Sequence, residues 1–137
     1  MRIITHIGPH FDEAVALYFL REHGEKKYPG VNQAKLEFCG TGCDPEDKTW
    51  EQHLAEGTLL IGIGGGPFDE HPHISGAARK EGESACSLVA RDLDVLTHPL
   101  YRELIKEVTK ADLTGVSPLH CSNVMKLICR LHGSLSA

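Results

Sequence analysis

The sequence predicts an α/β fold of three layers, in which a mainly parallel sheet carries helices on both faces. Short apolar runs have the length and composition of buried strands, at 2–7, 34–40 and 58–63. Segments with helical character follow them, at 12–27, 46–56, 83–94, 98–111 and 118–132. Strands that alternate with helices imply right-handed crossovers, and therefore parallel strands.

The first strand, 2–7, ends where Gly8-Pro9 interrupts the run. The helix after it is apolar from residue 14 to residue 20 with hardly a polar break, as expected of a helix packed closely on a sheet. Lys26 and Lys27 lie at its predicted end, where they suit the negative pole of the helix dipole. The chain then turns into the second strand, 34–40.

A short helix at 46–56 leads into the third strand, 58–63, which Gly residues bound on both sides. Residues 66–82 are rich in Gly, Pro and His and have no periodicity, so they predict a long loop of the kind that is often functional. The last helix, 118–132, has apolar residues at helical spacing that fit either the core or a dimer face.

Length and charge limit the classes of function. A chain of 137 residues that is 41% hydrophobic fits one domain, 1–137, with a real core. Its net charge of −5 shows no electrostatic footprint for long nucleic acid, although bound divalent ions would let it take a small anion. Neither a signal peptide nor a run of ~18 apolar residues is present, which predicts a cytoplasmic protein outside the membrane.

The cysteines do not form a recognisable framework. There are 5 of them, at 39, 43, 86, 121 and 129, an odd number without a Cys-x-x-Cys pair. We expect them to be reduced, and the last three to be small buried side chains among apolar helical residues. Cys39 and Cys43 lie at a strand end, where a ligand role stays open.

Six side chains of metal-binding type lie near the predicted ends of strands and helices: His6, His10, Asp12, Asp69, His71 and Asp112. The first three follow the strand at 2–7, the next two follow the strand at 58–63, and the last closes the helix at 98–111. In open α/β sheets, ligands bind beyond the carboxyl ends of the strands. Mixed imidazole and carboxylate ligands suit Mn²⁺, Fe²⁺ or Zn²⁺ better than Ca²⁺.

Each of these side chains also has an ordinary structural explanation. Asp12 can cap the helix that follows it, and His6 can be a hydrogen-bonded core histidine. Asp69 can be a turn residue, and Asp112 can end its helix. A metal site is favoured because it explains all six together.

Other catalytic motifs fit poorly. The glycines at 62 and 64–66 follow a strand, but Pro67 begins an irregular loop where a dinucleotide site needs a helix. The chain has no Gly-Lys-Ser/Thr of a P-loop, and no Gly-x-Ser-x-Gly surrounds Ser84 or Ser87. A Cys-His nucleophile stays open, because such partners need only be close in space.

Four segments resemble the DHH phosphoesterase superfamily, and most closely its branch that contains the melanocyte-proliferating-gene proteins. THIGPHFDEAVA, 5–16, resembles the opening motif. FDEHP, 68–72, resembles the Asp-His-His signature, with Glu70 where the first His would stand. GESACSLVARDL, 82–93, and KADLTG, 110–115, are similar to the Ser-containing helix and the later single-Asp motif. The resemblance covers positions 1 to about 115.

This resemblance implies a DHH-domain-like fold and a metal-dependent hydrolase of phosphate esters or short oligonucleotides. It implies that the metal ligands are His6, His10, Asp12, Asp69, His71 and Asp112. The expected cofactor is Mn²⁺, with Zn²⁺ or Mg²⁺ as alternatives, and two such ions would polarise the phosphoryl group and activate water. Either catalytic candidate, Glu13 or His71, could assist proton transfer.

The chain departs from the family in three places. The family usually has an Asp at the end of the strand before its signature, where this chain has Gly62, and the spacing from His6 to His10 is one residue shorter. A second domain usually closes the site, so we expect a homo-oligomer or a separate partner subunit to do so here. These departures keep two alternatives open: a non-catalytic metal- or ligand-binding domain with a degenerate DHH site, and a structural partner module that binds no metal.

Overall fold

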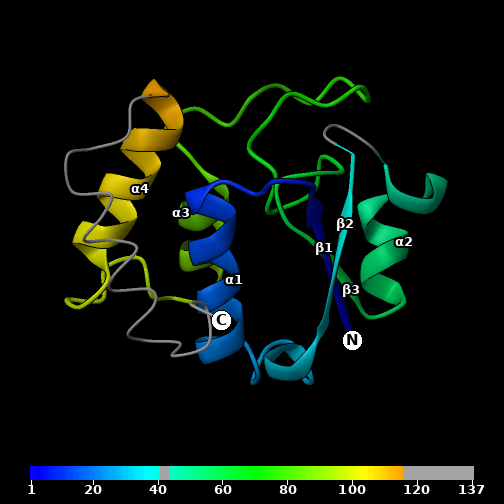
Figure 1. Cartoon of the computed structure of the whole chain (residues 1–137), viewed down its shortest axis with the longest axis horizontal. Coiled ribbons are helices and arrows are strands. Elements are labelled where there is room, and N and C mark those ends of the chain that lie inside the picture. The colour runs from blue at the N-terminus through cyan, green and yellow to red at the C-terminus, as the bar shows by residue number, and fades with distance from the viewer. Residues whose placement is uncertain (41–43, 116–137) are drawn as a thin grey trace.

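The computed structural model describes residues 1–40 and 44–115, which form an α/β fold around a parallel sheet (Figure 1). The strands are β1 (Arg2–His6), β2 (Lys35–Cys39) and β3 (Thr58–Leu60), in the order β2-β1-β3. Both neighbours of β1 run parallel to it. The prediction of an α/β fold with a mainly parallel sheet is therefore confirmed.

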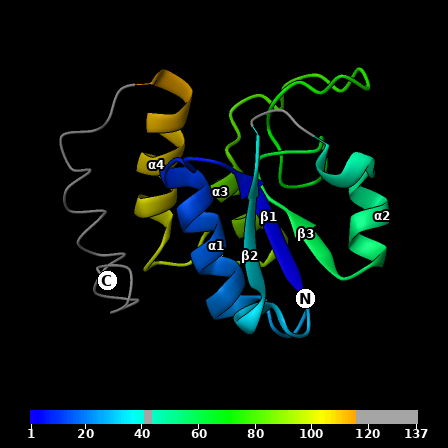
Figure 2. The same ribbon diagram turned by 45° about the vertical axis from the view of Figure 1, so that its right-hand side comes forward.

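Four α-helices accompany the sheet in the described part of the chain: α1 (Phe11–His23), α2 (Trp50–Ala55), α3 (Ala85–Asp92) and α4 (Arg102–Thr114). Two short 3-10 helices, η1 (Val31–Gln33) and η2 (Pro45–Asp47), precede β2 and α2. In both views, α1, α3 and α4 lie on one side of the strands and α2 lies on the other, beside β3 (Figures 1 and 2).

The first helix and its neighbours are shorter than predicted. The helix expected at 12–27 ends at His23, next to Gly24, which is a poor helix former and whose N–H closes the last turn on the Leu20 carbonyl. The helix expected at 46–56 is broken, because Glu46 adopts a left-handed φ of 58°. The strand expected at 58–63 ends at Leu60, since the chain turns at Gly62, where φ is +70°.

Later boundaries also shift. The helix expected at 98–111 begins at Arg102, because Pro99 disfavours helical backbone at the residue before it, and it continues to a Gly115 cap with φ of 66°. The helix expected at 83–94 begins after Ser84, whose hydroxyl accepts the Ser87 N–H at 3.1 Å. The loop at 66–82 has neither helix nor strand, as predicted. The helix expected at 118–132 lies outside the described residues.

Alternate side chains of the strands pack into two apolar clusters. Ile3 and Leu59 join the larger one, which contains the buried faces of α1, α3 and α4. Ile4 and Leu60 join the smaller one, against which Trp50 of α2 packs. This alternation is that of strands buried on two sides.

Cys86 lies fully buried in the larger cluster, which confirms it as a small core side chain. Burial also raises the pKa of its thiol well above the ordinary value. Cys43, Cys121 and Cys129 lie outside the described residues. No helix within 1–40 and 44–115 has the length and apolar character needed to cross a bilayer.

Candidate metal centre

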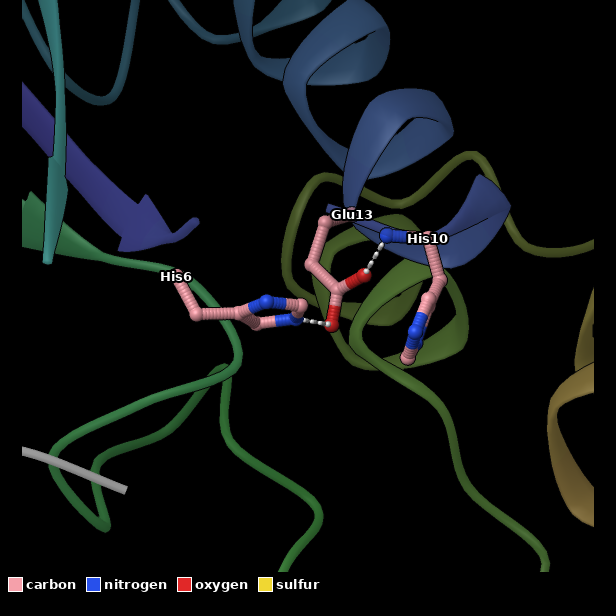
Figure 3. Close-up of side chains that lie close together, drawn as sticks. All are labelled: His6, His10 and Glu13. Carbon is pink, nitrogen blue, oxygen red and sulfur yellow. Dashed lines mark hydrogen bonds and ion pairs between the residues drawn. The ribbon is translucent and has the colours of Figure 1, made fainter. Parts of the chain in front are cut away.

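The site begins where β1 passes into α1. β1 ends at His6, a short turn follows, and α1 starts at Phe11. Gly8 permits this turn with φ of +68°. Figure 3 shows the result: the carboxylate of Glu13, in the first turn of α1, lies between His6 and His10.

His6 is 4% exposed and both of its ring nitrogens have an acceptor beside them. Nδ1 lies 3.1 Å from the Ile7 carbonyl oxygen, and Nε2 lies 3.0 Å from Oε1 of Glu13. Burial lowers the pKa of His6, but the bonds to Ile7 and Glu13 and the nearby negative charge outweigh it, so the pKa is raised above 6.5. The surroundings of His6 therefore favour a cation at Nε2, whether a proton or a metal ion.

Asp12 is a buried carboxylate with one unused oxygen. Its side chain is 1% exposed, Oδ2 accepts the Ala85 N–H at 3.2 Å, and Oδ1 has no hydrogen-bond partner among the described residues. Burial, followed by the adjacent Glu13, raises the pKa of Asp12 to about 7.

The alternative that Asp12 caps its own helix is wrong. Asp12 bonds the first residue of α3, more than seventy positions along the chain. The N–H group at the start of α1, that of His10, donates instead to Oε2 of Glu13 at 2.8 Å. The capping function thus belongs to Glu13, and the free oxygen of Asp12 is available for another role.

Asp69 has the structural role that a turn residue would have. Its Oδ2 accepts the Gly65 N–H at 2.8 Å, and its Oδ1 accepts both the His71 N–H at 3.1 Å and a bond with His71 Nδ1 at 2.9 Å. A carboxylate held this way orients an imidazole, as the outer partners of metal-binding histidines do. Asp69 therefore holds the imidazole of His71 in place.

Glu70 is the most unusual group of the site. It is fully buried, and neither carboxylate oxygen has a hydrogen-bond partner in the described part of the chain. Nε2 of His71 lies 3.3 Å from Oε1, close enough for an ion pair but outside hydrogen-bonding geometry. Burial, with a further contribution from the charge of Asp12, raises the pKa of Glu70 to about 7.

Sequence reasoning did not include Glu70 among the metal ligands. A signal was present, because Glu70 occupies the position of the first His of the signature that this segment resembles. Glu side chains are seldom fully buried, and only the packing around position 70 shows that this one is.

Asp112 comes from α4 and reaches the same region. It lies inside the helix, two residues before its end, so the alternative that it ends the helix is wrong. Arg79 from the long loop is its cationic neighbour, with Nη2 3.9 Å from Oδ2. Burial and the charge of Asp12 raise the pKa of Asp112.

These side chains form four overlapping sets of three, and in each set the ligand atoms lie within 4.8 Å of one another. The sets are His6, His10 and Glu13; His10, Asp12 and Asp112; Asp12, Glu13 and Glu70; and Asp69, Glu70 and His71. All six predicted ligands belong to at least one set. Shared members join the sets into one cluster, which is buried at Asp12, Glu13, Asp69 and Glu70, partly buried at Asp112, and open at His10 and His71.

Two further side chains of types that can bind metal, His73 and Cys39, lie apart from this cluster. His73 bonds Asp44 at 2.8 Å and Ser75 at 2.8 Å, and it lines a separate cavity of about 360 Å³ beside Trp50. Cys39, at the end of β2, belongs to none of the four sets.

The donor set fits a divalent ion of the borderline type. Imidazole nitrogens and carboxylate oxygens together suit Mn²⁺, Zn²⁺ or Fe²⁺, and two buried carboxylates with unused oxygens supply the negative charge. Comparison with known proteins found no matching family model, no matching curated protein and no matching solved structure.

Proposed function

We propose that this chain is a metal-dependent hydrolase of phosphate esters or short oligonucleotides, with the three-layer fold of a DHH-like domain. Mn²⁺ is the proposed cofactor, with Zn²⁺ or Mg²⁺ as alternatives, and the cytoplasm is the proposed location. The observation that carries the proposal is the pair of buried carboxylates Asp12 and Glu70. Both belong to the cluster of ligand sets, and both have oxygens without a hydrogen bond in the described part of the chain.

The physical reason is the cost of burying charge. An ionised carboxylate without a partner in the interior costs several kcal/mol, so such groups are normally paired or bound to metal. Within the described residues, only one oxygen of Asp12 and neither oxygen of Glu70 has a hydrogen bond. The ion-pair contact of Glu70 is with the half-exposed His71, whose Nε2 lies 3.3 Å from Oε1. A divalent ion would satisfy these oxygens at once, and the nearby imidazoles would complete its coordination.

Bound divalent ions would supply the Lewis acidity that polarises a phosphoryl group and lowers the pKa of an attacking water. Residues of the chain would provide coordination and proton transfer. Glu13 is buried and bonded at both oxygens, so it suits coordination better than proton transfer. His71 is half-exposed, oriented by Asp69 and directed by Nε2 toward Glu70, so we assign to it the transfer of a proton to the leaving oxygen.

The substrate is proposed to be small because the chain offers little positive charge to hold a long anion. Its net charge is −5, and the cation beside the cluster is Arg79, paired loosely with Asp112. The cluster is open at His10 and His71. A second copy of the chain or a separate subunit would cover this side and exclude water.

The test is a Mn²⁺ titration and a phosphodiesterase assay on one sample of the purified protein. The double variant His10→Ala with Asp12→Ala should lose metal binding and turnover while keeping its circular dichroism spectrum. Glu22→Ala, which removes an exposed carboxylate of α1, is the control. Unchanged Mn²⁺ affinity in the double variant would remove the basis of the proposal.

A non-catalytic binding domain is the second candidate, and Gly62 favours it because a family ligand is missing there. This candidate predicts metal binding without turnover. A robust phosphodiesterase rate in the wild-type protein that Glu70→Gln eliminates would count against it.

A further inference from the structure

Gly62 and Glu13 compete for one volume at the end of β3. Gly62 adopts φ of +70°, and its N–H donates to the Phe68 carbonyl at 2.8 Å. A Cβ built on Gly62 would lie 2.7 Å from Oε1 of Glu13 and 3.2 Å from its Cγ. A side chain at position 62 and the present position of the Glu13 carboxylate are therefore incompatible. The Glu13 carboxylate occupies the space into which a residue 62 side chain would project.

Glu13 also lies where two ligand sets meet. It shares one set with His6 and His10, and a second set with Asp12 and Glu70. These sets have no other member in common. A carboxylate can bind a different ion through each of its oxygens, so Glu13 has the position and the chemistry of a bridge.

We propose that Glu13 is the carboxylate that bridges two divalent ions, in the space that Gly62 leaves open because it has no side chain. This inference rests on the proposed function and adds the bridging residue to it. Its present contacts suit the role. Glu13 is 2% exposed, its Oε2 is fixed by the His10 N–H at 2.8 Å, and its Oε1 lies 3.0 Å from Nε2 of His6 (Figure 3).

The first ion would take the place of a proton at His6 Nε2. Nδ1 of His6 can keep its bond to the Ile7 carbonyl, which leaves the Nε2 lone pair directed at the space beside Oε1 of Glu13. An ion there would meet His6, His10 and Glu13 together.

The second position has independent support. Glu70 is fully buried with neither oxygen hydrogen-bonded in the described part of the chain, and Oδ1 of Asp12 is equally unpartnered. Asp12, Glu70 and Glu13 together form the second of the two sets that share Glu13. Buried acceptors without donors are rare in folded proteins, and a cation at this point would satisfy three oxygens at once.

The experiment measures the number of Mn²⁺ ions per chain by equilibrium dialysis, and their magnetic coupling by electron paramagnetic resonance. We expect the wild-type protein to bind two ions with a coupled spectrum. Glu13→Gln, which has the same shape, and Glu13→Ala should each lose one ion and the coupling. Glu22→Ala, on the exposed face of the same helix, should retain both.

A rescue variant tests the competition for space. Glu13→Ala combined with Gly62→Asp removes the carboxylate from one side and supplies it from the other, and Asp tolerates positive φ better than most residues. We expect this variant to recover the second ion and the coupled spectrum.

The outcomes separate the two proposals. If the wild-type protein binds no Mn²⁺, the proposed function is wrong and the bridge with it. If the wild-type protein binds two coupled ions and Glu13→Gln still does, Glu13 is not the bridge, although the metal-dependent function survives.

Discussion

Replacement of Glu70 by Met should make the metal-free protein more stable, although Glu70 belongs to the proposed metal site. Glu70 is fully buried and has no hydrogen bond in the described part of the chain, and its pKa is about 7 instead of 4.5. Its charge therefore has no effect on folding below pH 4.5, lowers stability as the pH rises, and has its full effect above about pH 7.

The magnitude follows from the pKa. A difference of one in pKa corresponds to about 1.4 kcal/mol, so the change from 4.5 to about 7 corresponds to about 3 kcal/mol at pH 8. Met has nearly the volume of Glu and needs no hydrogen bond, so Glu70→Met should recover about this free energy of unfolding. In a domain of this size that is roughly 10 °C in Tm.

The assay is urea unfolding in the presence of a chelator, followed by the fluorescence of the single tryptophan, Trp50. At pH 8 the variant should be the more stable, at pH 4.5 the gap should shrink, and added Mn²⁺ should stabilise the wild-type protein more than the variant. Glu22→Met, at an exposed position of α1, is the control for the gain of an apolar side chain. Equal stability of Glu70→Met and wild type at pH 8 would show that position 70 carries no buried charge, and would refute the reasoning.

Three further predictions concern the same cluster. Gly62→Ala should destabilise the protein by more than Gly8→Ala and weaken Mn²⁺ binding in a titration, because both have φ near +70° but only Gly62 has a carboxylate 2.7 Å from the added Cβ. Equal effects of the two would contradict the crowding at position 62. Asp69→Asn should cost about 1–2 kcal/mol in urea unfolding and about tenfold or more in phosphodiesterase kcat, because it disturbs the bond that orients His71 for proton transfer. An unchanged kcat would contradict that role of Asp69. Mn²⁺ affinity, measured by calorimetry, should rise up to ~100-fold per pH unit between pH 5 and 6 and level off above pH 7. The reason is that Asp12 and Glu70, each with a pKa of about 7, must lose their protons before they bind the ion. A flat profile would show that these two carboxylates are not ligands.

The strands and helices were predictable where the local signal is strong. The apolar run that ends at Gly8-Pro9 fixed β1 and the start of α1 to within a residue, because apolar strands and breakers act locally. The ends of α1 and β3 were missed. They depend on Gly24 and Gly62, whose backbone angles follow from what packs around them and not from the residue type alone.

The sequence by itself determined that side chains of a type that can bind metal follow β1 and β3, and parallel strands bring their carboxyl ends to the same edge of a sheet. Only the tertiary structure decided how two neighbouring carboxylates of the cluster differ: Asp69 bonds its own loop through both oxygens, whereas Glu70 is buried with neither oxygen hydrogen-bonded in the described part of the chain. It likewise decided that Glu13 fills the space above Gly62. The physical reason is that side-chain direction in an irregular loop depends on backbone angles fixed by distant packing, which no periodicity in the sequence encodes.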